Sequence, residues 1–111
     1  MDKRKYPRIA LQGMEADISD GRGFFTGIVH DISRFGLALD DISAKINSHA
    51  EFLTVIVNGK GGHFKLRVRP CWETVSGIQK IIGGHIDNSP IDWTGFVIRF
   101  EQDKDDIWGN A

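Results

Sequence analysis

The sequence contains a single cysteine, Cys71, in 111 residues. One cysteine excludes an internal disulfide, and it also excludes the paired cysteines that structural zinc sites commonly use. The histidines offer no alternative, because no two of them have the spacing of metal ligands; they are His30, His49, His63 and His85. We therefore expect a protein of a reducing compartment, the cytoplasm, with neither a metal nor a cofactor.

Long apolar runs and a large net charge are also missing. No stretch approaches the roughly 18 apolar residues that indicate a membrane-spanning helix, so membrane insertion is not expected. The 14 basic and 15 acidic residues give a formal charge of -1, which argues against DNA or RNA as the main partner. Nucleophile elbows, phosphate-binding loops and paired catalytic carboxylates are not recognisable either, so we do not expect an enzyme.

A repeated alternation of apolar and polar residues is the dominant pattern that is present, and it is typical of half-buried strands. In the clearest case, residues 64–69, three apolar residues should face a core while Lys65, Arg67 and Arg69 face solvent. Weaker alternation predicts further strands at 14–18, 23–32, 36–40, 52–58, 78–82 and 95–101. Helix has little support, with short candidates only at 41–50 and 103–108.

Glycine supplies 13 residues, several of them where strands need turns. The run 59–62 reads as a hairpin connection, and Gly83-Gly84 as a bulge or strand end. Because closure removes exposed strand edges, the pattern predicts one all-β domain over 1–111, a six- to seven-stranded antiparallel barrel with at most short helical segments. We expect residues 1–8 to form a flexible arm and 102–111 a short acidic tail.

One polar cluster lies at residues 31–36. In an extended segment, Asp31 and Ser33 present a carboxylate and a hydroxyl on one face, while Ile28 and Ile32 point to the other. Gly36 ends the segment, where glycine can adopt a positive φ or let a ligand approach the backbone closely. The carboxylate can accept hydrogen bonds from the N1 and N2 donors of guanine.

A second cluster lies near the N-terminus, at residues 4–8. Arg4 and Arg8 are four positions apart, with Pro7 restricting the backbone between them. Each guanidinium offers a planar fork of donors to a phosphate or to the O6 and N7 atoms of guanine. The two clusters together therefore favour a ligand that contains both phosphate and guanine.

The two clusters match the RxxxR and (D/N)xSxxG signatures of the PilZ-domain family, which the chain resembles from about residue 4 to 101. The resemblance implies a six-stranded antiparallel barrel that binds cyclic di-GMP on its outside. Arg4 and Arg8 would contact phosphate and guanine, Asp31 and Ser33 a guanine, and Gly36 would shape the turn. It also implies late strands at 68–72 and 95–100, and the short acidic end suggests a stunted or missing C-terminal helix.

The leading hypothesis is a cyclic di-GMP receptor that signals to an unidentified effector protein in trans. One alternative is a PilZ-like adaptor that binds proteins but no nucleotide, using the basic stripe of residues 65–69 and an exposed Trp108. We expect the other tryptophans, Trp72 and Trp93, to be core or packing residues.

A further alternative is a small barrel that binds single-stranded nucleic acid. In such a barrel Tyr6, Phe25 and Phe35 would stack on bases beside the arginines. The net negative charge argues against this hypothesis.

Overall fold

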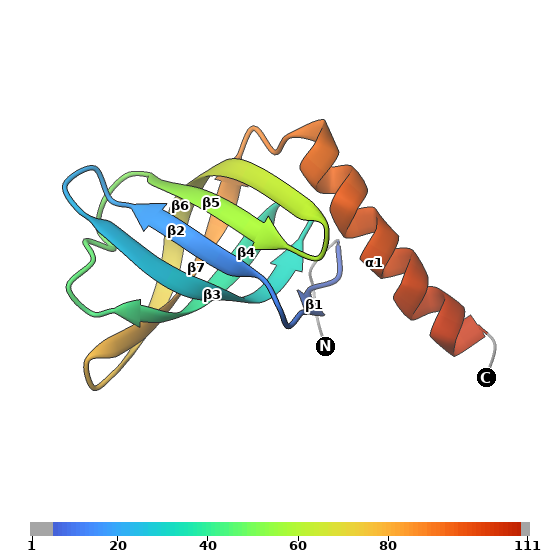
Figure 1. The fold of residues 1–111 in the computed structure, drawn as a ribbon, viewed down its shortest axis with the longest axis horizontal. Coiled ribbons are helices and arrows are strands. Elements are labelled where there is room, and N and C mark those ends of the chain that lie inside the picture. The colour runs from blue at the N-terminus through green and yellow to red at the C-terminus, as the bar shows by residue number, and fades with distance from the viewer. Residues whose placement is uncertain (1–5, 110–111) are drawn as a thin grey trace.

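The computed structural model describes residues 6–109, and the side chains of residues 6–101. This part of the chain forms seven strands followed by one helix (Figure 1). The elements are β1 (Ile9–Ala10), β2 (Glu15–Ser19), β3 (Phe24–Ser33), β4 (Gly36–Ser43), β5 (Leu53–Gly59), β6 (Gly62–Ser76), β7 (Gln79–Asp87) and α1 (Ile91–Gly109).

The strands form a closed antiparallel barrel. Six of them follow the order β3-β2-β5-β6-β7-β4, and pairing of β3 with β4 closes the ring. The short β1 adds to β3 as a seventh strand. The predicted barrel is thus confirmed, as is the hairpin connection between β5 and β6. Within residues 6–109, no helix is long and apolar enough to cross a bilayer.

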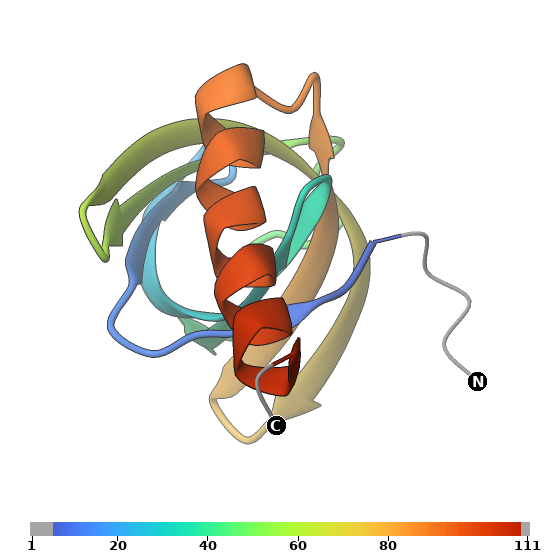
Figure 2. The same ribbon diagram turned by 90° about the vertical axis from the view of Figure 1, so that its right-hand side faces the viewer.

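The helix α1 lies across one end of the barrel, which we call the helix end (Figure 2). Trp93 is fully buried there, and its ring meets the ring of Phe64 from β6 at a centroid distance of 5.2 Å. Phe96 packs on the same residue at 5.0 Å. The helix therefore closes the apolar interior, and the expectation that Trp93 is a core residue is confirmed.

The predicted strand at 95–101 is wrong, because these residues lie within the 19-residue helix α1. The expectation of a stunted or missing C-terminal helix is wrong for the same reason. Trp93, Phe96, Val97 and Phe100 recur at the three- and four-residue spacing of one helix face, which packs on the core. The segment 95–101 does not include Trp93, and without Trp93 its apolar residues resemble a strand.

A β-bulge in β3 decides which side chains of the motif at residues 31–36 face outward. Val29 pairs with Leu39 and Asp31 pairs with Ala38, so His30 is an extra residue without a partner on β4. The bulge shifts the alternation by one position. Val29 is consequently buried and Ile28 is 46% exposed, which corrects the prediction that Ile28 faces the core.

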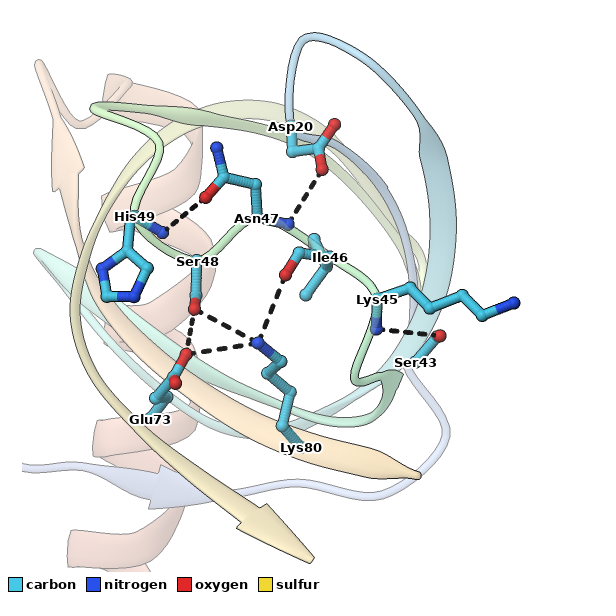
Figure 3. A network of polar contacts seen from close by, with 9 residues as sticks. All are labelled: Asp20, Ser43, Lys45, Ile46, Asn47, Ser48, His49, Glu73 and Lys80. Carbon is cyan, nitrogen blue, oxygen red and sulfur yellow. Dashed lines mark hydrogen bonds and ion pairs between the residues drawn. The ribbon is translucent and has the colours of Figure 1, made fainter. Parts of the chain in front are cut away.

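The opposite end of the barrel, which we call the loop end, is closed by residues 44–52 between β4 and β5. The helix predicted at 41–50 is wrong, since residues 41–43 form the end of β4 and the residues after them form turns and bends. Lys80 of β7 points into this end and is only 7% exposed. Its Nζ donates to the Ile46 carbonyl and the Ser48 hydroxyl, each at 3.2 Å, and pairs with Glu73 at 3.4 Å (Figure 3).

Two carboxylates hold the closing loop in place. The pKa of Glu73 is lowered, chiefly by the hydrogen bond from the Ser48 hydroxyl and further by the charge of Lys80. The pKa of Asp20 is lowered by backbone N–H groups, of which that of Asn47 has the largest effect. Both carboxylates therefore stabilise the loop in their ionised form.

Candidate ligand-binding site

Four of the five predicted site residues lie in the described part of the chain, and three of these four come from one hairpin. Asp31 and Ser33 lie at the end of β3 and Gly36 begins β4, joined by a two-residue turn. The fourth, Arg8, immediately precedes β1, and pairing of Ala10 with Asp31 brings that segment alongside β3. The fifth predicted residue, Arg4, lies outside the described residues.

Arg8 and Asp31 form a direct ion pair. The Nε and Nη2 atoms of Arg8 both lie 2.9 Å from Oδ1 of Asp31. The side chains are 26% and 14% exposed, so the pair is largely covered but reachable from solvent. The second carboxylate oxygen lies 3.1 Å from Nδ1 of His30. Neighbouring side chains point to opposite faces in a regular strand, and the bulge at His30 explains why these two meet.

A cavity of about 200 Å³ opens beside the ion pair. Residues from the arm and from strands β3, β4, β6 and β7 line it, so segments distant in sequence meet there. They include Arg8, Ser33, Gly36, Trp72, Gly84 and His85. Three of the predicted residues thus line one cavity, and Asp31 is joined to it through Arg8.

Trp72 is a site residue that the sequence analysis missed. It is 43% exposed rather than buried, and the guanidinium carbon of Arg8 lies 5.8 Å from its ring centre. Pro70 pairs with Gly84 and Trp72 with Gly83, so Cys71 forms a bulge in β6. A Cβ atom at Gly83 would lie 2.1 Å from the indole, so only glycine leaves room for the ring. The bulge predicted at Gly83-Gly84 therefore lies in β6, opposite the two glycines, and not in β7 itself.

Gly36 is required for close packing of strands. A Cβ atom there would lie 2.9 Å from the carbonyl oxygen of Gly84 on β7. Its φ is not among the positive values, so the positive-φ alternative is not the one adopted. Ser33 directs its hydroxyl to the Gly36 carbonyl at 3.4 Å, which places both residues in one tight turn.

A wider hollow of about 1270 Å³ lies at the loop end and is lined mostly by apolar atoms. Phe24 and Ile78 on its rim are 89% and 85% exposed. Its lining contains no arginine and none of the motif residues. Lysines line the hollow, but the smaller cavity is the one lined by an arginine and by motif residues, and an arginine can recognise an anionic nucleotide. Size alone therefore does not identify the site.

Within residues 6–101, no three histidine, cysteine, aspartate or glutamate side chains are grouped as a metal site requires. The aromatic residues expected to stack on single-stranded nucleic acid are also divided. Tyr6 packs edge-on against Phe35 at 5.2 Å, whereas Phe25 lines the hollow at the loop end.

No family model matches the sequence, and no curated protein matches it. Solved structures do match. The PilZ domain of YcgR from Escherichia coli, solved with c-di-GMP, has a TM-score of 0.64 at 13% identity, covering 99% of this chain and 100% of that one. The chain has the PilZ-domain fold.

Two longer proteins contain the same fold. YcgR from Escherichia coli in complex with c-di-GMP has a TM-score of 0.73 at 15% identity, covering 98% of this chain and 49% of that one. The MrkH–c-di-GMP complex of K. pneumonia has a TM-score of 0.70 at 14% identity, covering 93% and 52%. The chain thus spans about half the length of these two proteins, and at such identities the likeness establishes the fold alone.

Proposed function

We propose that this PilZ-fold domain is a receptor for cyclic di-GMP, with the ligand bound on the outside of the barrel at the cavity beside Arg8. The observation that carries the proposal is the Arg8–Asp31 ion pair, which joins the two sequence motifs at one cavity. The site residues are Arg4, Arg8, Asp31, Ser33 and Gly36, with Trp72 added.

The two paired side chains suit the two edges of guanine. Asp31 accepts hydrogen bonds from the N1 and N2 donors, and Arg8 donates to O6 or N7. In the structure these groups satisfy one another at 2.9 Å. A guanine that displaces one of the two side chains takes over its hydrogen bonds, so the other charge is not left unpaired. This lowers the cost of binding.

The remaining parts of the ligand find suitable surfaces nearby. The indole of Trp72 offers an aromatic face on which a base can stack. A cavity of about 200 Å³ is below the roughly 300 Å³ at which enclosed ligand pockets begin. One base therefore enters it, while the phosphates and the second base lie on the surface within reach of the arginines of the arm.

The expected affinity follows from the contacts. One bidentate contact between arginine and a base gives about 1 to 3 kcal/mol of discrimination, and one stacked base gives about 1 to 3 kcal/mol. Several such contacts, reduced by the cost of ordering the arm, give micromolar binding, about 8 kcal/mol.

The proposed receptor is not an enzyme and passes its signal to an effector protein in trans. Its place is the cytoplasm, where the exposed thiol of Cys71 stays reduced. The exposed stripe of Lys65, Arg67 and Arg69 is available for a partner protein, and Arg67 already lies 3.7 Å over the ring of Phe52. The same stripe supports the second candidate function, an adaptor that binds no nucleotide.

Isothermal titration with cyclic di-GMP tests the proposal. We expect heat with micromolar affinity for the unmodified protein, and a loss of about tenfold or more for Arg8→Ala and for Asp31→Ala. Arg22→Ala is the matched control, because Arg22 is an exposed arginine in the turn between β2 and β3 and lies outside the cavity. It should bind as the unmodified protein does.

Thermal melts of each variant, without ligand, exclude misfolding as the cause of lost binding. Absence of heat at about 100 micromolar ligand with folded protein would reject the receptor function. The adaptor function would then be favoured, and a pull-down whose partners are the same with and without nucleotide would support it.

A further inference from the structure

Arg34, in the turn between β3 and β4, connects the candidate site to α1. Its Nε and Nη2 atoms donate to the two carboxylate oxygens of Glu101 at 2.9 and 2.8 Å. Glu101 is only 9% exposed, so removing Arg34 would leave a largely buried carboxylate without a partner. The hydrogen bonds from the guanidinium to Glu101 also raise the pKa of Arg34. A two-pronged contact of this kind fixes the position and the plane of the guanidinium.

The edge of the Arg34 guanidinium binds Glu101, and its planar face supports the arm. Its carbon atom lies 4.6 Å from the ring centre of Tyr6, which is a cation–π contact. The same ring packs against Phe35 at 5.2 Å. Tyr6 lies two residues before Arg8, so a fixed Tyr6 limits where Arg8 can reach.

The backbone of the turn is also held by α1 and by the segment before it. The Ser89 hydroxyl donates to the Arg34 carbonyl at 2.7 Å, and the indole N–H of Trp93 donates to the Ser33 carbonyl at 3.2 Å. Trp93 belongs to α1 and Ser89 to the segment that leads into it. The turn of the second motif is thus attached to the helix by both its side chain and its main chain.

We propose that Arg34 and Glu101 are positioning residues of the site, through which α1 holds Tyr6 and thereby sets Arg8 against Asp31. Neither residue lines the cavity. The part of this inference that concerns affinity rests on the proposed binding of cyclic di-GMP. The part that concerns the arm does not, because it rests only on the contacts of Arg34 with Glu101 and Tyr6. By thermodynamic reciprocity, a ligand that orders the arm also tightens the attachment of α1.

Three variants test the proposal. Glu101→Gln removes the charge that fixes Arg34, and we expect about a fivefold loss of affinity, the order of one cation–π contact. Tyr6→Leu removes the aromatic ring together with its hydroxyl, and it should cause a similar loss of affinity with an almost unchanged thermal midpoint. Combining the two changes should cost no more than either, since both remove one connection.

The double variant Arg34→Glu with Glu101→Arg separates positioning from simple stabilisation. It restores the ion pair to the helix, but it places an anion beneath Tyr6, where a cation is required. We expect the thermal midpoint to recover relative to Glu101→Gln while the affinity stays low. Recovery of affinity in this variant, or unchanged affinity in Tyr6→Leu, would overturn the proposal.

A measurement without nucleotide keeps this test independent of the proposed function. In NMR spectra of the ligand-free protein, the unmodified chain should give cross-peaks between the rings of Tyr6 and Phe35, and Glu101→Gln should weaken them. Persistence of these cross-peaks at full strength in Glu101→Gln refutes the positioning role. Their loss supports it even if the unmodified protein shows no heat with cyclic di-GMP, a result that would reject only the receptor function.

Discussion

The two ends of the barrel use polar side chains in opposite ways. At the loop end, Lys80 is buried at 7% exposure, and each of its contacts is internal. Toward the helix end, Arg8 and Asp31 are paired at 26% and 14% exposure beside an open cavity. A buried lysine has no route to a ligand, whereas a partly exposed ion pair can exchange one partner for a ligand group.

This difference separates stability from binding. The ammonium of Lys80 replaces hydration that the fold has removed, so losing it leaves the Ile46 carbonyl unpaired in the interior. The Arg8–Asp31 pair is partly exposed, so water can reach either charge when its partner is removed, and the pair contributes less to stability. Substitutions at the loop end should therefore affect unfolding, and substitutions beside the cavity should affect ligand affinity.

The largest expected effect is that of Lys80→Met at the loop end. Methionine retains an unbranched apolar stem but leaves the Ile46 carbonyl and the Ser48 hydroxyl without the lysine donor. We expect the free energy of unfolding to fall by about 2 kcal/mol, the cost of unsatisfied buried groups. Chemical denaturation measures this change, and titration should find the affinity for cyclic di-GMP unaltered.

Lys45→Met is the matched control, because Lys45 is an exposed lysine in the same closing loop. Its free energy of unfolding should stay within about 0.5 kcal/mol of that of the unmodified protein. If Lys80→Met instead weakened ligand binding as strongly as it weakened the fold, the separation between the two ends would fail.

The second expected effect is on ligand affinity, by Gly83→Ala beneath the indole of Trp72. The new methyl group would lie 2.1 Å from the indole, so the ring must leave its present position. We expect the affinity to fall by about tenfold, the order of one stacked base. Trp72→Ala should lower the affinity similarly, and the two changes together should cost little more.

Gly95→Ala provides the control for a glycine substitution. A Cβ atom at Gly95 meets nothing within 4 Å, and the residue lies in α1. Alanine should stabilise the helix by about 1 kcal/mol and leave the affinity unchanged. Normal binding by Gly83→Ala would show that the position of the indole does not matter to the ligand.

The sequence predicts features that depend on neighbouring residues and misses those that depend on strand register. Outward-facing Asp31 and Ser33 follow from local alternation, although the bulge at His30 that keeps them outward does not. Trp72 was expected to be a core or packing residue and not part of the site, because its exposure depends on Gly83, a residue of another strand that lies opposite it. Lys80 was missed because burial of a lysine requires partners that only the folded loop supplies.

The helix candidate at 103–108 lies within α1, but the earlier part of the helix, residues 91–101, was missed for a different reason. Its signal was local, since Trp93 and Phe96 are three apart and Phe100 follows four later. A segment rich in aromatic and β-branched residues also satisfies a strand pattern, and short apolar runs are ambiguous between the two. Pro90 and Asp92 at the start of the helix were the signals that resolve the ambiguity.

The smallest expected effect is a pH dependence confined to the loop end. The pKa of Glu73 lies below its ordinary value of 4.5 and that of Asp20 below 3.8. Carboxylates whose pKa is lowered by folding stabilise the protein above the unfolded value, and this contribution is lost as the pH falls through the folded value. The attachment of residues 44–52 should thus weaken only below about pH 4.5.

Ser48→Ala tests this expectation, because the Ser48 hydroxyl is the largest cause of the lowered pKa of Glu73. The variant should melt at a lower temperature than the unmodified protein at pH 7. The gap in melting temperature should narrow as the pH falls below about 4.5, because protonation of Glu73 removes the carboxylate to which the hydroxyl donates. Ser76→Ala, an exposed serine at the end of β6, should show no such narrowing. A gap for Ser48→Ala that stays constant from pH 7 to 3 would mean that the ionised carboxylate of Glu73 does not hold the loop.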